Sequence, residues 1–203
     1  MAKIDLRKEL KHLYNPPAKA PVLVDVPPMS FLTLDGRGDP NTAPEFRAAF
    51  EVVYGVAYTL KFMLKKAAEA PDWGVMPLEG LWWTDDMATF SMERKDAWKW
   101  TLMVMQPDFV TAEQVERALA AVRAKKNLPG LDKLRFERLH EGACAQIMHV
   151  GPYAAEAPTI ERLHHFIREL GSEPTGKHHE IYLGDPRRTA PEKLKTVIRQ
   201  PLR

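Results

Sequence analysis

Residues 179–183 have the pattern of a β-strand that carries a carboxylate and a phenol on one face. In His179-Glu180-Ile181-Tyr182-Leu183, alternation places Glu180 and Tyr182 on one side and the aliphatic residues on the other. We expect the aliphatic side to meet the helices and Glu180 to point into an open cleft. A carboxylate beside aromatic rings can neutralise a cationic ligand or activate a water molecule. The same pattern also fits an edge strand whose glutamate is only solvated.

Four of the five tryptophans fall in two short predicted strands. Alternation makes Trp82 and Trp83 face opposite ways in the first strand, whereas Trp98 and Trp100 share a face in the second. Core packing can explain any one of them. Together they offer more aromatic surface than a small sheet needs, so Trp83 and Trp100 are candidates for an aromatic wall against a ligand.

Metal, nucleotide and thiol chemistry have less support. Adjacent histidines at 164–165 and 178–179 diverge by about 100° on a helix and about 180° on a strand, so we expect no metal site. The glycines of residues 36–40 lack the spacing of nucleotide-binding loops, and we expect no cofactor. Cys144, the only cysteine, is interpreted as a small buried residue.

Charge and composition favour a small-molecule partner. The 203 residues contain 29 basic and 27 acidic side chains, and a net charge of +2 gives no bulk reason to bind nucleic acid or a membrane surface. The charged start of the sequence is unlike a secretory signal, and no run of about 18 apolar residues occurs. With one cysteine, no intrachain disulfide can form, which fits a cytoplasmic protein. A homo-oligomer is left open.

The elements that must position these residues repeat in order. Each half is predicted as hairpin, helix, strand, strand. The predicted strands are residues 22–26, 31–34, 81–84, 98–105, 134–139, 143–150, 179–183 and 196–202, and the core-facing helices run over about 42–64 and 158–170. Thr42 with Glu45, and Thr111 with Gln114, have the spacing of capping boxes at helix starts.

This order predicts an α+β fold with helices on one side of each sheet. Two such halves side by side would enclose a ligand cleft between their bare faces. We expect an N-terminal arm over residues 1–20 and a domain over 21–203. Its halves would cover about 21–110 and 131–203, joined by a helix at 111–127.

Several motifs in order resemble the GyrI-like small-molecule-binding family, in particular its stand-alone branch without a DNA-binding domain. The likeness extends from about Leu6 to Arg203. The runs that carry it are Pro77-Leu78-Glu79-Gly80-Leu81-Trp82-Trp83, Trp98-Lys99-Trp100-Thr101, Gln106-Pro107-Asp108-Phe109, His149-Val150-Gly151-Pro152-Tyr153, Glu180-Ile181-Tyr182-Leu183-Gly184-Asp185-Pro186-Arg187-Arg188 and Arg199-Gln200-Pro201.

The resemblance implies two SHS2-like modules, each a strand-helix-strand-strand unit, in a pseudo-twofold arrangement around a ligand cleft. In related drug-responsive regulators, an acidic residue surrounded by aromatics binds flat cationic drugs. Glu180 matches that residue by its position on the penultimate strand. Tyr182 lies beside it, and Tyr153, Trp83 and Tyr54 are implied as the aromatic wall.

The same resemblance implies a second function for the cleft. Some stand-alone members open cyclopropane-containing, DNA-alkylating natural products by hydrolysis. In that case Glu180 would be the acid/base, with Glu156 as a further candidate, although its place near a helix start also suits simple charge placement.

Three functions therefore stay open at the sequence level. The leading one is binding of amphipathic, planar, often cationic molecules, because aromatic surface and one negative charge suffice for it. The alternative is a hydrolase of strained electrophilic rings, which also requires Glu180 to hold a water molecule. A protein-interaction module, such as a gyrase inhibitor proper, is the third.

Overall fold

The computed structural model describes residues 3–87 and 94–203. Within it the chain forms two compact units that are interleaved in sequence. Unit 1 comprises Met1–Leu6, Met29–Met76 and Trp82–Leu139, and unit 2 comprises Arg7–Pro28, Pro77–Leu81 and His140–Arg203. None of the helices among the described residues is long and apolar enough to span a membrane.

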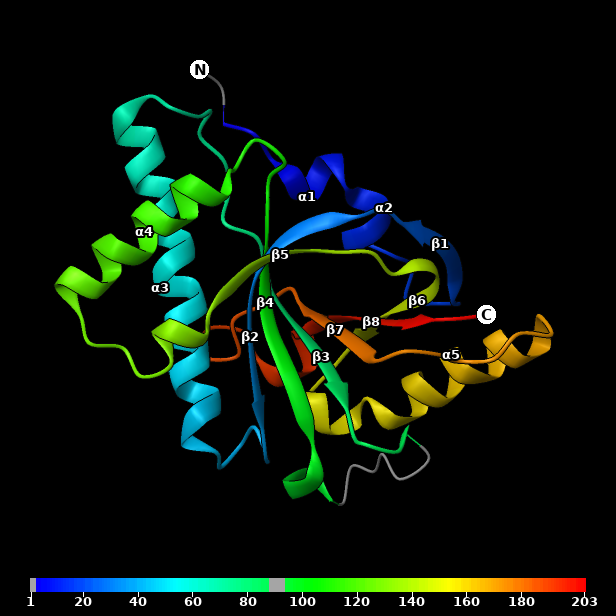
Figure 1. The fold of residues 1–203 in the computed structure, drawn as a ribbon. Coiled ribbons are helices and arrows are strands. Elements are labelled where there is room, and N and C mark those ends of the chain that lie inside the picture. Colours follow the sequence, from blue (N-terminus) through cyan, green and yellow to red (C-terminus); the bar gives the residue numbers. More distant parts are fainter. Residues whose placement is uncertain (1–2, 88–93) are drawn as a thin grey trace. The chain divides into compact units, whose positions relative to one another are not determined.

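Unit 1 is an antiparallel sheet packed against two helices. Its strand order is β3-β4-β2-β5, and β3 contributes only its last two residues to this unit. The elements are β2 (Met29–Arg37), α3 (Pro44–Ala67), β3 (Leu78–Trp83), η2 (Lys95–Ala97), β4 (Lys99–Gln106), α4 (Ala112–Lys125), η3 (Leu131–Lys133) and β5 (Arg135–Leu139). Helix α3 packs on β2, β4 and α4 (Figure 1).

Helix starts in unit 1 test the two predicted capping boxes. The box at Thr111 is confirmed, because its hydroxyl accepts from the backbone N–H of Gln114 and the Gln114 side chain accepts from the Thr111 N–H. The prediction of a capping box at Thr42 is wrong. Helix α3 begins at Pro44, after Ala43 as N-cap and without a side-chain cap. Proline at the first helical position presets the helical φ and has no N–H to satisfy.

Unit 2 is a second antiparallel sheet with one long helix. Its strand order is β1-β6-β8-β7-β3. The elements are α2 (Lys11–Tyr14) with most of α1 (Leu6–Glu9), β1 (Val22–Val26), β6 (Gly142–Val150), η4 (Tyr153–Ala155), α5 (Ala157–Glu169), β7 (His178–Tyr182), η5 (Pro191–Lys193) and β8 (Lys195–Pro201). Helix α5 packs on β6 and β8, and the core there consists of Ala145, Ile147, Leu163, Ile167 and Ile198.

The α+β class is confirmed, but both predicted hairpins are wrong. Strand β1 pairs with β6, and β2 pairs with β5, so each predicted hairpin is divided between the two units. Each unit still contains a strand, a helix and two further strands in chain order, namely β2-α3-β3-β4 and β6-α5-β7-β8. That the units are duplicated SHS2 modules stays a prediction.

The face of β7 that carries Glu180 also differs from our expectation. Glu180 pairs with Ile198 across β7 and β8, and Ile198 belongs to the core under α5. Paired residues share a face of an antiparallel sheet, so Glu180 lies on the helix-covered side. Ile181, which is fully buried, faces the other way. Alternation separates two faces but does not say which one a helix covers when both are buried.

Candidate functional site

The strongest cluster of chemical groups lies in unit 2, where β7 meets the segment leading into α5. It consists of Glu180, Glu156, His178, Tyr182 and Tyr153, and we call it the Glu180 cluster. The Tyr182 hydroxyl donates to Glu180 Oε2 over 2.6 Å, and His178 Nε2 lies 3.0 Å from Glu180 Oε1. The Glu156 side chain lies beside that of Glu180 and helps to lower its pKa.

Local sequence explains how these side chains converge. Residues 178, 180 and 182 alternate along β7 and therefore project from one face. The chain approaches α5 through Gly151, whose φ of 143° favours glycine. His149 fixes this bend through Thr159 Oγ1, 3.0 Å from Nδ1, and the Pro152 carbonyl, 3.3 Å from Nε2. Glu156 then occupies the N-cap position of α5.

The Glu180 carboxyl group is held in its ionised form. Burial opposes this ionisation, but hydrogen bonds from His178 and Tyr182, together with the neighbouring Glu156, prevail and hold the pKa of Glu180 below its usual value. Glu156 lies beside it and is only 2% exposed. The start of α5 adds a favourable field for one negative charge.

Two tyrosines give the cluster an aromatic side. The rings of Tyr153 and Tyr182 meet edge to face with centroids 5.4 Å apart. Burial, together with the carboxylates of Glu156, Glu180 and Asp185, raises the pKa of Tyr153 to about 12. Its hydroxyl is therefore a hydrogen-bond donor at neutral pH. Both tyrosines are half-buried, and the side chain of Glu180 is 14% exposed.

A second polar cluster lies on the opposite face of β7, and we call it the His179 network. His179 is fully buried between two carboxylates, with Nε2 2.9 Å from Glu79 Oε2 and Nδ1 3.0 Å from Glu141. The Tyr14 hydroxyl donates to Glu79 over 2.7 Å. Arg199 donates to Glu141 over 3.1 Å. The network thus links β3, β6, β7, β8 and the N-terminal segment.

The His179 network is ionised. Although burial opposes its charge, the Glu141 and Glu79 carboxylates raise the pKa of His179 to about 9. Burial would also raise the pKa of Glu141, but His179 and Arg199 lower it to about 2. The network also holds the N-terminal segment, because Arg199 donates to the Leu13 carbonyl over 2.8 Å. We did not predict it, since no local spacing relates residues so distant in sequence.

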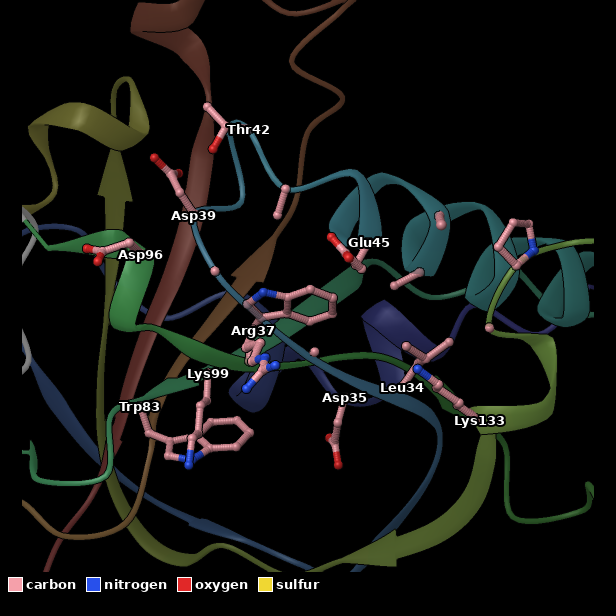
Figure 2. Close-up of a pocket in the computed structure, with 18 residues that line it drawn as sticks. Leu34, Asp35, Arg37, Asp39, Thr42, Glu45, Trp83, Asp96, Lys99 and Lys133 are labelled. Atoms are coloured by element: carbon pink, nitrogen blue, oxygen red, sulfur yellow. The ribbon is translucent and has the colours of Figure 1, made fainter.

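Unit 1 contains a separate groove with a volume of about 1010 Å³. Trp83 lines it together with charged side chains such as Asp35, Arg37 and Lys99 (Figure 2). Further lining comes from the loop after β2, the first turns of α3 and the loop before β5. Arg37, the last residue of β2, and Lys133, the last residue of η3, also line this groove.

The predicted aromatic wall residues of unit 1 have different surroundings. Trp83 is half-buried, whereas Trp100 is fully buried against Gly36 and edge-on to Phe46, with centroids 5.1 Å apart. Trp100 thus forms the floor of the groove. Tyr54 lies in α3 within an aromatic row, 5.0 Å from the Phe50 ring. The structure therefore brings Glu180, Glu156, Tyr182 and Tyr153 together in unit 2, while Trp83, Trp100 and Tyr54 belong to unit 1.

Neither metal nor thiol chemistry gains support. In residues 3–87 and 94–203, no three His, Cys, Asp or Glu side chains are grouped so as to hold a metal ion. Burial raises the pKa of the Cys144 thiol to about 12, which leaves it a poor nucleophile.

Solved structures share this architecture. An uncharacterized conserved protein from Listeria innocua is 40% identical, with a TM-score of 0.91 over 98% of this chain and all of that chain. A hydrolase from the same organism is also 40% identical, with a TM-score of 0.89 over the full length of both chains. The C-terminal domain of EcmrR is 12% identical, with a TM-score of 0.56 over 90% of this chain and 96% of that domain, and shares the fold alone.

Sequence comparison agrees with the fold. No curated protein matches the chain. The model of the GyrI-like small molecule binding domain matches residues 19–203, which include both units almost completely. The chain therefore belongs to the GyrI-like small-molecule-binding family.

Proposed function

We propose that this protein is a hydrolase of small aromatic electrophiles, which it binds at the Glu180 cluster. The observation that carries the proposal is that two glutamates, Glu156 and Glu180, lie side by side, with Glu180 held ionised by donors on both of its oxygens. In the proposed reaction Glu180 is the base and Glu156 the acid of general acid–base catalysis. The sequence favoured binding over hydrolysis because it did not reveal this pairing.

The reaction that suits the pair is addition of water to a strained ring conjugated to a carbonyl group. Glu180 takes a proton from water as the oxygen attacks the ring carbon. The breaking carbon–carbon bond sends its electron pair into the conjugated carbonyl, and Glu156 protonates the resulting anion. Water is consumed, and one proton then passes from Glu180 to the neighbouring Glu156. The pair thereby returns to its starting state.

Two further observations support the proposal. Two Listeria innocua proteins described as hydrolases are 40% and 41% identical and align over 98% or more of this chain. Within the cluster, Tyr153 and Tyr182 offer aromatic edges and hydroxyl donors for a flat substrate with a carbonyl group. The substrate class proposed is therefore a planar aromatic molecule with a cyclopropane ring as its electrophile.

Binding without turnover is the second candidate. The Glu180 carboxylate lies beside two tyrosine rings, which suits a planar cation. Binding and hydrolysis use the same residues but predict different products.

Product analysis tests the proposal. The purified protein is incubated with a cyclopropane-containing DNA alkylator, and mass spectrometry follows a product heavier by one water molecule. A Glu180→Gln variant and protein-free buffer serve as references. We expect ring-opened product to accumulate only with the parent protein. Recovery of intact alkylator, bound in proportion to the protein, would instead support binding alone.

A further inference from the structure

His178 has a position that neither the predicted function nor the predicted site accounts for. The residue is 3% exposed, and its Nε2 lies 3.0 Å from Glu180 Oε1. An ionised carboxylate only accepts hydrogen bonds, so this nitrogen must carry a proton. Glu180 thus receives donors on both oxygens, from His178 on one and from Tyr182 on the other.

These two hydrogen bonds favour the ionised form of Glu180, because donors to a charged acceptor stabilise the charged form. Of the two donors, the imidazole is the more buried, whereas Tyr182 is half-buried.

The groups around His178 come from three further elements. From α5, His164 and Arg168 are close enough to interact electrostatically with this region. Burial and the neighbouring His178 lower the pKa of His164. From β8, Gln200 is next to Arg199, the residue paired with His179, and is close enough to affect the pKa of His164.

Tyr153 and Glu156 complete the surroundings from the segment before α5. The lowered pKa of His164 favours its neutral form near pH 7. The contact from His178 is therefore the buried hydrogen bond placed to stabilise the charge of Glu180.

We propose that His178 is a positioning residue that keeps Glu180 ionised, as the base of the proposed reaction, by donating Nε2–H to Glu180 Oε1. This inference rests on the proposed function for its catalytic meaning. Its physical content, however, is the ionisation of Glu180, which can be measured without substrate.

Three variants separate this role from general stabilisation. His178→Phe fills a similar volume but has no donor. His178→Gln places an amide N–H close to the position of Nε2 and should restore the contact. His165→Phe is the matched control, because His165 is on α5 with a side chain 70% exposed.

The first measurement is a carbon-13 NMR titration of glutamate-labelled protein, with the Glu180 signal assigned through Glu180→Gln. In His178→Phe the titration midpoint of Glu180 should rise by about one to two pH units, since a hydrogen bond to a charged group is lost. His178→Gln should titrate within about half a unit of the parent. His165→Phe should match the parent.

The second measurement is the pH profile of turnover on the ring-opening substrate. The acid limb of this profile should shift to higher pH in His178→Phe and should lie at the parent's position in His178→Gln. A midpoint in His178→Phe equal to that of the parent overturns the positioning role even if turnover is normal. A shifted midpoint with no turnover in the parent leaves the positioning role intact and refutes the hydrolase. If His178→Phe does not fold, His178→Asn, whose amide stops short of Oε1, takes its place in both measurements.

Discussion

His178 and His179 are consecutive residues of β7, yet their imidazoles contact carboxylates on opposite faces of the strand. His178 Nε2 lies 3.0 Å from Glu180 in the cluster near α5, and His179 lies between Glu79 and Glu141 in the buried network. A period of two along the strand separates the rings. The pair therefore provides one contact to a candidate active site and one to a structural network.

Glu180→Gln distinguishes hydrolysis from binding. The amide keeps the shape of the side chain but cannot accept a proton from water. For a hydrolase, turnover of a cyclopropane substrate should fall by about a hundredfold or more while its Kd changes little. For a binder, affinity for a planar cationic dye should fall roughly five- to thirtyfold, and neutral ligands should lose less. Glu161→Gln, at an exposed position of α5, is the control.

Glu156→Gln tests the acid of the pair. The amide keeps the shape of the side chain, so the fold should persist, but it has no acidic proton to deliver to the departing electrons. We expect turnover to fall by about a hundredfold for substrates whose ring-opened anion is strongly basic, and much less for those that yield a stabilised anion. Steady-state rates over a substrate series measure this dependence. Equal losses across the series would remove Glu156 from proton transfer.

The His179 network should make the free energy of unfolding fall at both high and low pH, with a plateau between them. The pKa of His179 is about 9, above its unfolded value of about 6.5, so its contribution is complete below pH 6.5 and lost as pH rises through 9. The pKa of Glu141 is about 2, below its usual value of 4.5, so its contribution is complete above pH 4.5 and lost as pH falls toward 2. Urea unfolding should therefore show greatest stability between about pH 4.5 and 6.5.

Removal of the His179 side chain should also lower the free energy of unfolding, for a reason other than a change of pH. His179→Leu leaves Glu79 and Glu141 buried without the cation between them. Loss of one partner from a buried ionic cluster typically costs about 3–5 kcal/mol. His165→Leu should change the free energy of unfolding by less than about 0.5 kcal/mol, because its side chain is 70% exposed. Similar unfolding midpoints for both variants would mean that the network contributes little.

The sequence predicted which side chains share a face of a strand more reliably than which of the two faces a helix covers. Glu180 and Tyr182 were expected together because two residues along a strand project from the same side, and their hydrogen bond confirms it. The covered face was predicted wrongly because Ile181 and Glu180 both lie on buried sides of the strand. The His179 network was missed because Tyr14 and Arg199 are joined only by tertiary structure.

The residues between the strands explain why the two predicted hairpins do not form. Two-residue hairpin turns need positive φ in their central residues, which glycine and asparagine supply. Pro27 and Pro28 follow β1 directly, and proline restricts φ to about −65°. The connection from β5 to β6 uses His140 and Glu141, and neither has positive φ. Consequently the strands pair with partners from other parts of the chain.

Gly36 and Gly55 provide a last prediction, because alanine should have opposite effects at the two positions. A Cβ at Gly36 would lie 2.1–2.6 Å from three ring atoms of Trp100, which is fully buried and has no room to move away. Gly36→Ala should therefore lower the free energy of unfolding by about 1–3 kcal/mol. At Gly55, within α3, the nearest atom to a new Cβ is on Leu128 at 3.6 Å, an ordinary contact. Gly55→Ala should raise stability by about 0.5–1 kcal/mol, because alanine loses less backbone entropy in a helix. Urea unfolding followed by tryptophan fluorescence measures both changes. Equal stability of Gly36→Ala and the parent would show that Trp100 is free to move, and the floor of the groove in unit 1 would then be adaptable rather than fixed.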